Sequence, residues 1–369
     1  MYLSPIDALL DLVSPTPSEL DSLTTDWEAL YDVAARHSLA PLLHARLEAI
    51  LDRLPSPVRE SLHRARTESA AQIMFFEFEL MQIVQTFRTK KVPLIVFKGI
   101  PLARQLLHDP ALRPMIDIDV LVRGVDLVAS THILNEIGWE MPDTANPFQT
   151  KAYDLNKEVA GAPIRLELHW SNQRKGEYDL PEERLWQETI ETDEGTLFTP
   201  EMALFTLVLH AARHSFRPYR QLVDIAHAVA LWNDTLDWER VVALATEANA
   251  LPMLATILAL VQRDLNTPMP RHESLARFLN RRRIQLTIRF LSPQRLLYGQ
   301  KIGILDRYWV PVASGAWQPA KFFLADMLRT PKQIAHIYDL PEDSPLLPLY
   351  VIFRPFLLAR KYLQRVLSR

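Results

Sequence analysis

The stretch Leu94–Val122, LIVFKGIPLARQLLHDPALRPMIDIDVLV, decides the fold of this chain. At its end, aliphatic and acidic residues alternate strictly, which is typical of a β-strand with two different faces. Asp117 and Asp119 share one face, and the other face carries the aliphatic residues Ile116, Ile118, Val120 and Val122. Neighbouring carboxylates repel each other, and Mg²⁺ or Mn²⁺, which prefers oxygen ligands, removes that cost. A polar outer face on a half-buried strand is the alternative that the motif alone leaves open.

The residues before this strand predict a strand, a tight turn and a short helix. Leu94–Phe97 is a continuous apolar run, as in a buried strand, and Lys98 and Gly99 close it. Ile100–Leu107 then has the composition of a helix, with Pro101 in its first turn. A helix N-terminus attracts phosphate, and glycine lets the backbone approach it closely. Lys98 is therefore expected either to bind a triphosphate or to be an ordinary surface lysine at a turn.

A third strand is predicted at Ile164–Trp170, IRLELHW. It also alternates, with Arg165, Glu167 and His169 on one face and apolar residues on the other. If this strand pairs beside the aspartate strand, Glu167 becomes a third carboxylate near the same point. His169 would then orient Glu167, contact the substrate or form an ordinary cross-strand polar pair.

These motifs resemble those of the DNA polymerase β-like nucleotidyltransferase superfamily, and most closely its bacterial uncharacterised nucleotidyltransferase family. The resemblance rests on Phe97-Lys98-Gly99, Leu102-Ala103, Arg113-Pro114-Met115, Asp117-Ile118-Asp119, Glu167-Leu168-His169-Trp170 and the helical stretch His210–Ala226. It covers roughly residues 91 to 226. Two departures affect nucleotide handling. The usual Gly-Ser turn is replaced by Lys98-Gly99, with a longer gap to the first aspartate, and the third carboxylate, often Asp, is Glu167.

The resemblance implies an α+β fold, in which a small mixed-sheet nucleotidyltransferase core is flanked by N-terminal and C-terminal helical regions. We expect these parts at residues 91–175, 1–90 and 176–369, respectively. It also implies an enzyme that moves a nucleotidyl group from a nucleoside triphosphate such as ATP to a small molecule, a peptide, a protein side chain or an RNA end. The alternatives are a catalytically degenerate binding or antitoxin-like module, and kinase-like phosphoryl transfer on the same scaffold.

The same resemblance assigns roles to individual residues. Asp117, Asp119 and Glu167 are the expected metal ligands and catalytic residues, with Mg²⁺ or Mn²⁺ as the ion. Glu167 would complete a second metal site or act as a base toward an acceptor hydroxyl. The residues expected to bind nucleotide are Lys98, Gly99, Arg113, His169, His210 and Asp224. Arg113 could instead neutralise the paired aspartates in a structural role.

Histidines in the following helical stretch offer a second polar set. His210 and His214 are four residues apart and therefore lie on one helix face, and Asp224 and His227 are three apart further on. Such a set could bind zinc. Without a supporting motif, we favour a role in tying helices together or in closing over the nucleotide.

Composition excludes several classes of protein. The 369 residues carry a formal net charge of −3, which argues against a dominant nucleic-acid surface, so no stable DNA binding is expected. The absence of cysteine excludes disulfides, thiolate zinc sites and a cysteine nucleophile. The start, MYLSPIDALLDLVS, has no basic segment before its apolar residues, and no apolar run reaches the roughly 18 residues of a membrane span. We expect a soluble cytoplasmic protein without membrane association.

Helices are predicted at both ends of the chain. Val58–Thr89 has the pattern of a long amphipathic helix, in which Met74 and the adjacent pair Phe75 and Phe76 should fill the core. Phe353–Arg369 reads as a basic amphipathic helix, which we expect to pack on the helical C-terminal region. Binding to an anionic membrane surface is the alternative for this tail.

Overall fold

The computed structural model describes residues 2–19, 23–141, 152–171, 178, 180–268, 270, 272–299, 334–335, 341, 344–350, 352–354 and 356–357. The chain divides into two compact units, Met1–Gly299 and Gln300–Arg369. In the second unit, Ile334, Ala335 and Leu347 form a small buried cluster. The predicted tail helix, Phe353–Arg369, lies largely outside the described residues.

The first unit begins with helices that lead to a single long one. These are α1 (Pro5–Leu12), α2 (Trp27–Arg36), α3 (Ala40–Arg46), the 3₁₀ helix η1 (Glu48–Arg53) and α4 (Ser56–Lys90). Ser4 and Asp26 cap the first two helices, because their side chains accept hydrogen bonds from backbone N–H groups of the first turn. The predicted long helix is thus present as α4.

The described residues of this unit form one six-stranded mixed sheet, in the order β3-β4-β2-β1-β6-β5. Its strands are β1 (Ile95–Val96), β2 (Ile118–Leu121), β3 (Ala152–Val159), β4 (Ala162–His169), β5 (Thr189–Thr192) and β6 (Gly195–Phe198). β2 lies between β1, with which it is antiparallel, and β4, with which it is parallel. The α+β fold class predicted from the sequence is therefore confirmed.

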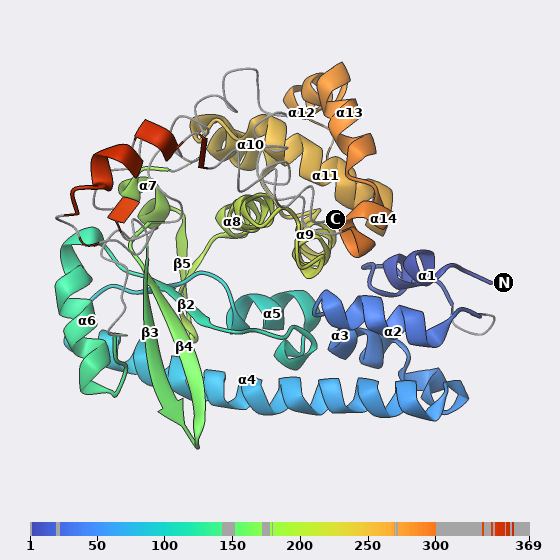
Figure 1. Cartoon of the computed structure of the whole chain (residues 1–369), viewed down its shortest axis with the longest axis horizontal. Helices are drawn as coiled ribbons and strands as arrows, with labels where there is room; N and C mark the ends of the chain where they lie inside the picture. Colours follow the sequence, from blue (N-terminus) through green and yellow to red (C-terminus); the bar gives the residue numbers. More distant parts are fainter. Residues whose placement is uncertain are drawn as a thin grey trace. The chain divides into compact units, whose positions relative to one another are not determined.

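One face of the sheet packs on α4 and on α6 (Leu127–Glu136), and α4 runs along this side of the sheet in Figure 1. Alternate side chains of the central strands enter this core, among them Ile118 and Val120 from β2 and Leu166 and Leu168 from β4. Because side chains alternate along a strand, the residues between them point to the opposite face. The acidic residues of β2 and β4 therefore avoid the main apolar core.

Two expectations about hydrophobic residues are wrong. Ile116 does not share the buried face of β2 but is exposed, because the strand begins only at Ile118 and the alternation does not extend back to it. Met74 and Phe75 are exposed as well. Phe76 and the residues at helical spacing from it form the buried side of α4. Met74, two residues earlier, therefore points away from the sheet. Phe75 lies at the margin of the buried side.

The remaining elements of the unit are short connections and a set of C-terminal helices. They are α5 (Ile100–Leu107), η2 (Pro110–Leu112), η3 (Gly124–Asp126), α7 (Glu182–Gln187), α8 (Pro200–Arg213), α9 (Arg220–Trp232), α10 (Trp238–Glu247), α11 (Leu251–Leu265), α12 (Glu273–Leu279), α13 (Arg282–Phe290) and α14 (Pro293–Tyr298). Thr199 caps α8 through a hydrogen bond from the Met202 N–H. Among the described residues, no helix is both long and apolar enough to cross a membrane.

Candidate functional site

The register between β2 and β4 brings the predicted acidic residues together. The strands are parallel, and Asp119 lies directly opposite Glu167, while Leu121 lies opposite His169. Both carboxylates therefore project from the same face of adjacent strands. The expectation that Glu167 becomes a carboxylate neighbour of the aspartate strand is confirmed.

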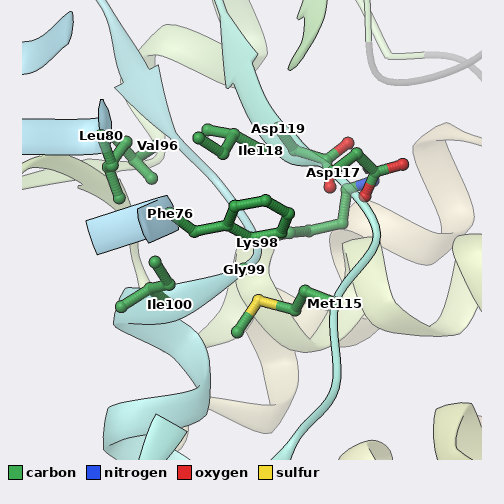
Figure 2. Close-up of a pocket in the computed structure, with 10 residues that line it drawn as sticks. All are labelled: Phe76, Leu80, Val96, Lys98, Gly99, Ile100, Met115, Asp117, Ile118 and Asp119. Atoms are coloured by element: carbon green, nitrogen blue, oxygen red, sulfur yellow. Dashed lines mark hydrogen bonds and ion pairs between the residues drawn. The ribbon is translucent and has the colours of Figure 1, made fainter. Parts of the chain in front are cut away.

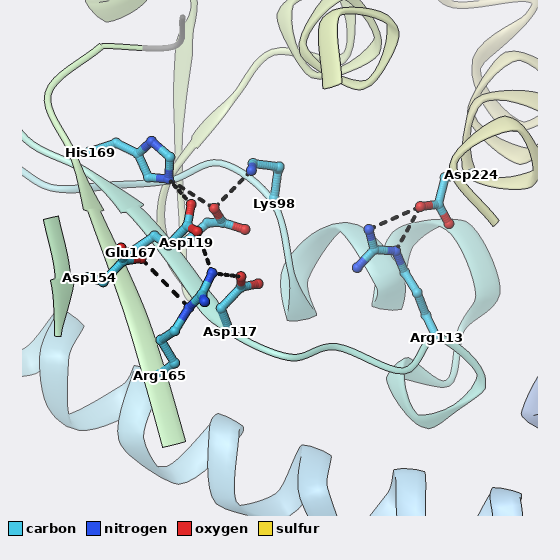
Figure 3. A network of polar contacts seen from close by, with 9 residues as sticks. All are labelled: Lys98, Arg113, Asp117, Asp119, Asp154, Arg165, Glu167, His169 and Asp224. Atoms are coloured by element: carbon cyan, nitrogen blue, oxygen red, sulfur yellow. Dashed lines mark hydrogen bonds and ion pairs between the residues drawn. The ribbon is translucent and has the colours of Figure 1, made fainter. Parts of the chain in front are cut away.

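Asp119 accepts two charge-assisted contacts on one oxygen. Lys98 Nζ donates to Asp119 Oδ1 at 2.8 Å, and His169 Nε2 lies 3.0 Å from the same atom. All three side chains are buried. Burial by itself raises the pKa of Asp119, but the Lys98 ammonium and His169 outweigh this effect and hold that pKa well below its usual range. Figure 3 shows this three-residue contact.

Glu167 has two partners of its own. His169 Nε2 lies 3.1 Å from Glu167 Oε2, and Arg165 Nη2 donates to Glu167 Oε1 at 2.6 Å. Burial raises the pKa of Glu167, but the hydrogen bond from His169 and its charge lower it to about 2. Glu167 is therefore ionised at physiological pH.

Asp117 is the carboxylate with the weakest compensation. Its nearest cation is Arg165, whose Nη2 lies 3.3 Å from Asp117 Oδ2. The same Nη2 also donates a hydrogen bond to Glu167. Burial raises the pKa of Asp117 to about 6, and the negative charges of Asp119 and Glu167 act in the same direction. Around Asp117, the negative charge of the carboxylates therefore exceeds the positive charge of the neighbouring side chains.

A small pocket opens beside these carboxylates. Its lining includes Lys98, Gly99, Met115, Asp117 and Asp119, and Figure 2 shows the lysine side chain reaching along the pocket toward the two aspartates. Gly99 has a φ of 71°, which is strained for any residue with a Cβ, and it precedes the first turn of α5. The turn therefore requires glycine.

A family model described as "uncharacterised nucleotidyltransferase" matches residues 24–266, which is more than half of the chain and includes the whole sheet. The chain belongs to this family. The resemblance seen in the sequence is confirmed. Comparisons with curated proteins and with solved structures give no match.

In this nucleotidyltransferase family member, Arg113 and Asp224 lie apart from the carboxylates and contact each other. Arg113 Nε and Nη2 each lie 3.0 Å from Asp224 Oδ2, and the two side chains are 8% and 3% exposed. Arg220 donates to the carbonyl oxygen of Pro114, next to Arg113. Burial, followed by the positive charge of Arg113, lowers the pKa of Arg220 to about 10. These contacts tie the segment before β2 to α9.

The histidines of the helical stretch take different positions. His210, on α8, lies near the cluster, where burial, followed by the charges of Lys98 and His214, holds its pKa well below its usual range. The rings of His210 and His214 are 4.5 Å apart. His227 instead contacts the carbonyl oxygen of Val13 at 3.1 Å, and Asp224 is paired with Arg113. The four residues considered for zinc are therefore not gathered into one site.

The nucleotidyltransferase core does contain a set of side chains suited to a cation. Within the described ranges, one group of metal-binding residue types has its ligand atoms all within 4.8 Å of one another, and it consists of Asp119, Glu167 and His169. The ammonium of Lys98 already lies against Asp119, so this position accommodates positive charge. Two carboxylates and an imidazole fit a divalent ion. The group has His169 where the sequence prediction had Asp117. His169 was expected to bind nucleotide, and the signal that could have marked it as a candidate ligand is its position two residues after Glu167 on the same strand face.

Proposed function

We propose that this chain is a divalent-metal-dependent nucleotidyltransferase that moves a nucleotidyl group from a nucleoside triphosphate to an acceptor. The observation that carries the proposal is the parallel register that places Glu167 opposite Asp119, next to Asp117, in a chain of this family. In the transfer of phosphoryl and nucleotidyl groups, the protein mainly stabilises developing charge and positions the reacting groups. A carboxylate cluster beside a glycine turn and a buried lysine supplies both.

In this reaction, an acceptor hydroxyl gives its proton to water and its oxygen forms a bond to the α-phosphorus, while the bond from that phosphorus to the bridging oxygen breaks and pyrophosphate leaves. A divalent ion held by Asp119 and Glu167, with Asp117 or His169 beside them, would supply charge neutralisation for the phosphates. The low pKa of Glu167 supports a role as a ligand more than as a base, because a strong acid's conjugate base accepts protons poorly. Lys98 and the backbone at Gly99 would hold the triphosphate, with His210 nearby.

A second function is favoured by one observation. Lys98 neutralises Asp119, and Arg165 contacts both Asp117 and Glu167, so most of the cluster's negative charge is compensated by the protein itself. Such a cluster could belong to a non-catalytic binding module of the antitoxin-like kind, in which the carboxylates serve the fold. Binding of a nucleoside triphosphate that depends on Mg²⁺ or Mn²⁺ separates the two functions, because only the enzyme needs the ion.

The decisive experiment is a transfer assay in cell extract with ATP labelled at either the α- or the γ-phosphate, since we expect a cytoplasmic acceptor. Wild-type protein should transfer the α-label in the presence of Mg²⁺ or Mn²⁺. Asp117→Asn should abolish transfer while keeping the Lys98–Asp119 contact, and Asp52→Asn, at a fully exposed aspartate, is the matched control.

Other outcomes assign other functions. Transfer of the γ-label alone would indicate a kinase-like reaction. Near wild-type transfer by Asp117→Asn would show that the assigned carboxylates are not the site. Absence of both transfer and metal-dependent triphosphate binding would favour the binding module.

A further inference from the structure

The side of α4 that faces away from the sheet carries a stripe of large apolar residues. Met74, Phe78 and Met81 are 70%, 51% and 63% exposed, and Phe75, at the margin, is 38% exposed. The opposite side of the same helix is buried in the core beneath the sheet. Contiguous apolar surface of this kind on a folded unit marks an interaction site, because its exposure to water is unfavourable.

The spacing of the stripe matches the seam of a coiled coil. Starting at Ala71, the exposed positions follow one another at alternating intervals of three and four residues, through Met74, Phe78 and Met81 to Gln85. This interval keeps one line of side chains facing a partner helix. The line extends for about 20 Å along α4, given a rise of about 1.5 Å per residue. The shape that fits such a line is another helix.

The charged residues at the two ends of the stripe indicate which helix packs against it. Glu68 lies ten residues before Phe78 and Arg88 ten residues after it, and both side chains are exposed. Neither forms an ion pair with any residue in the described part of the chain. When two copies of α4 lie antiparallel with Phe78 facing Phe78, a two-fold axis brings Glu68 of each copy to Arg88 of the other. A parallel arrangement would instead place like charges together.

We propose that this α4 stripe is a homodimer interface, in which a second copy of the chain docks its own α4 in antiparallel orientation about Phe78. The interface is apolar at its centre and has two equivalent Glu68–Arg88 contacts at its ends. The carboxylates of β2 and β4 point away from the core that α4 covers, so the dimer leaves the candidate site open. The proposal does not depend on the reaction that the site performs.

The first test is the oligomeric state of the full-length protein, measured by light scattering after size exclusion over a concentration series up to about 100 μM, well above a typical specific dissociation constant. We expect a dimer for the wild type and a monomer for Phe78→Glu. Val128→Glu, at a 69% exposed position on α6, is the matched control and should remain dimeric. Circular dichroism checks that each variant is folded. A monomeric wild type, or a dimeric Phe78→Glu, overturns the proposal.

The second test addresses the antiparallel register. Glu68→Arg alone and Arg88→Glu alone should each raise the dimer dissociation constant by about 10-fold or more, because each places like charges together at both ends. The double variant should restore the wild-type value. If the dissociation constant of the double variant is raised by as much as the two single changes combined, the proposed antiparallel register is wrong.

The absence of cysteine from the chain permits a third test. Phe78→Cys should form a disulfide between two copies on mild oxidation, since this position lies at the proposed axis. Leu231→Cys, at a 47% exposed position on α9, should not. A dimer without this disulfide would place the interface elsewhere. A monomer in which the Phe78→Cys thiol resists alkylation would mean that another part of the same chain covers the stripe, and the proposal would fail.

Discussion

The Arg113–Asp224 pair and the carboxylate cluster around Asp119 both bury charge, but they differ in how well that charge is balanced. In the pair, one guanidinium meets one carboxylate through two contacts, and both side chains are almost completely buried. In the cluster, three carboxylates share Lys98, Arg165 and His169, and the pKa of Asp117 rises to about 6. A buried ion pair of this kind is typical of a contact within the fold, whereas a cluster with a strongly raised carboxyl pKa is a candidate functional site.

The largest effect on stability is expected from breaking the pair. Asp224→Ala leaves the Arg113 guanidinium buried without its partner, and we expect the free energy of unfolding to fall by about 3–5 kcal/mol. Urea denaturation at pH 7 measures this. Arg113→Met combined with Asp224→Leu should recover part of the loss, because the Arg113 charge is removed as well, while the buried Arg220 still lacks the attraction of Asp224. A loss below about 1 kcal/mol for Asp224→Ala would show that the two residues do not hold α9 to the segment before β2.

Some contacts of these two regions follow from local sequence patterns, and others do not. The placement of Glu167 beside Asp119 was predictable, because two alternating strands with acidic residues at matching positions leave few registers. The partnership of Arg113 with Asp224 was not, because these residues are 111 positions apart and no local pattern links them. The same applies to the contact between Lys98 and Asp119, which no pattern in the sequence indicates.

Fold prediction failed at short, weakly patterned segments. β5 and β6 have four residues each, and β6 joins the sheet only through long-range pairing with β1, so local sequence gives little sign of them. Ile116 was assigned to the aliphatic face of β2 from the alternation of the sequence, and Met74 to the core from its hydrophobicity. Their exposure depends on where β2 begins and on how α4 is rotated about its axis, and tertiary packing decides both.

A smaller effect, of opposite sign, is expected within the cluster. Asp117→Asn removes a carboxyl whose pKa rises from 3.8 to about 6 on folding, so the variant should be more stable than the wild type at pH 7, on the order of 1–3 kcal/mol. Below about pH 4, the carboxyl is protonated in both folded and unfolded wild type. Between about pH 4 and 6, only the unfolded chain has lost the proton, so the contribution of Asp117 to stability declines as pH rises through this window.

Urea denaturation of both proteins from pH 4 to 8, without metal, measures the difference. The advantage of Asp117→Asn should grow across the window and then level off. An advantage that is constant with pH, or that grows toward acid, would show that Asp117 is not the strained member of the cluster.

The smallest effect is expected at Arg165, which contacts Asp117 and Glu167 but is partly exposed, so that solvent screens its charge. Arg165→Gln should lower stability by less than about 1 kcal/mol at low salt, with the difference vanishing at high salt. It should also move the titration of Asp117 to higher pH, because the carboxylate loses its nearest cation. A salt-independent loss would assign Arg165 to packing instead of charge balance.

The strand order has a consequence for how the protein is made. β1 pairs with β2 on one side and with β6 on the other, where Ile95 lies opposite Thr196. During synthesis, α4 and strands β1 to β4 leave the ribosome before β6 has been made. Until then, the backbone N–H and C=O groups on one edge of β1 have no strand to pair with. Pairing between strands far apart in the sequence slows folding and prolongs the exposure of an unpaired, aggregation-prone strand edge. We therefore expect nascent chains that end between β4 and β6 to be the species most in need of a chaperone.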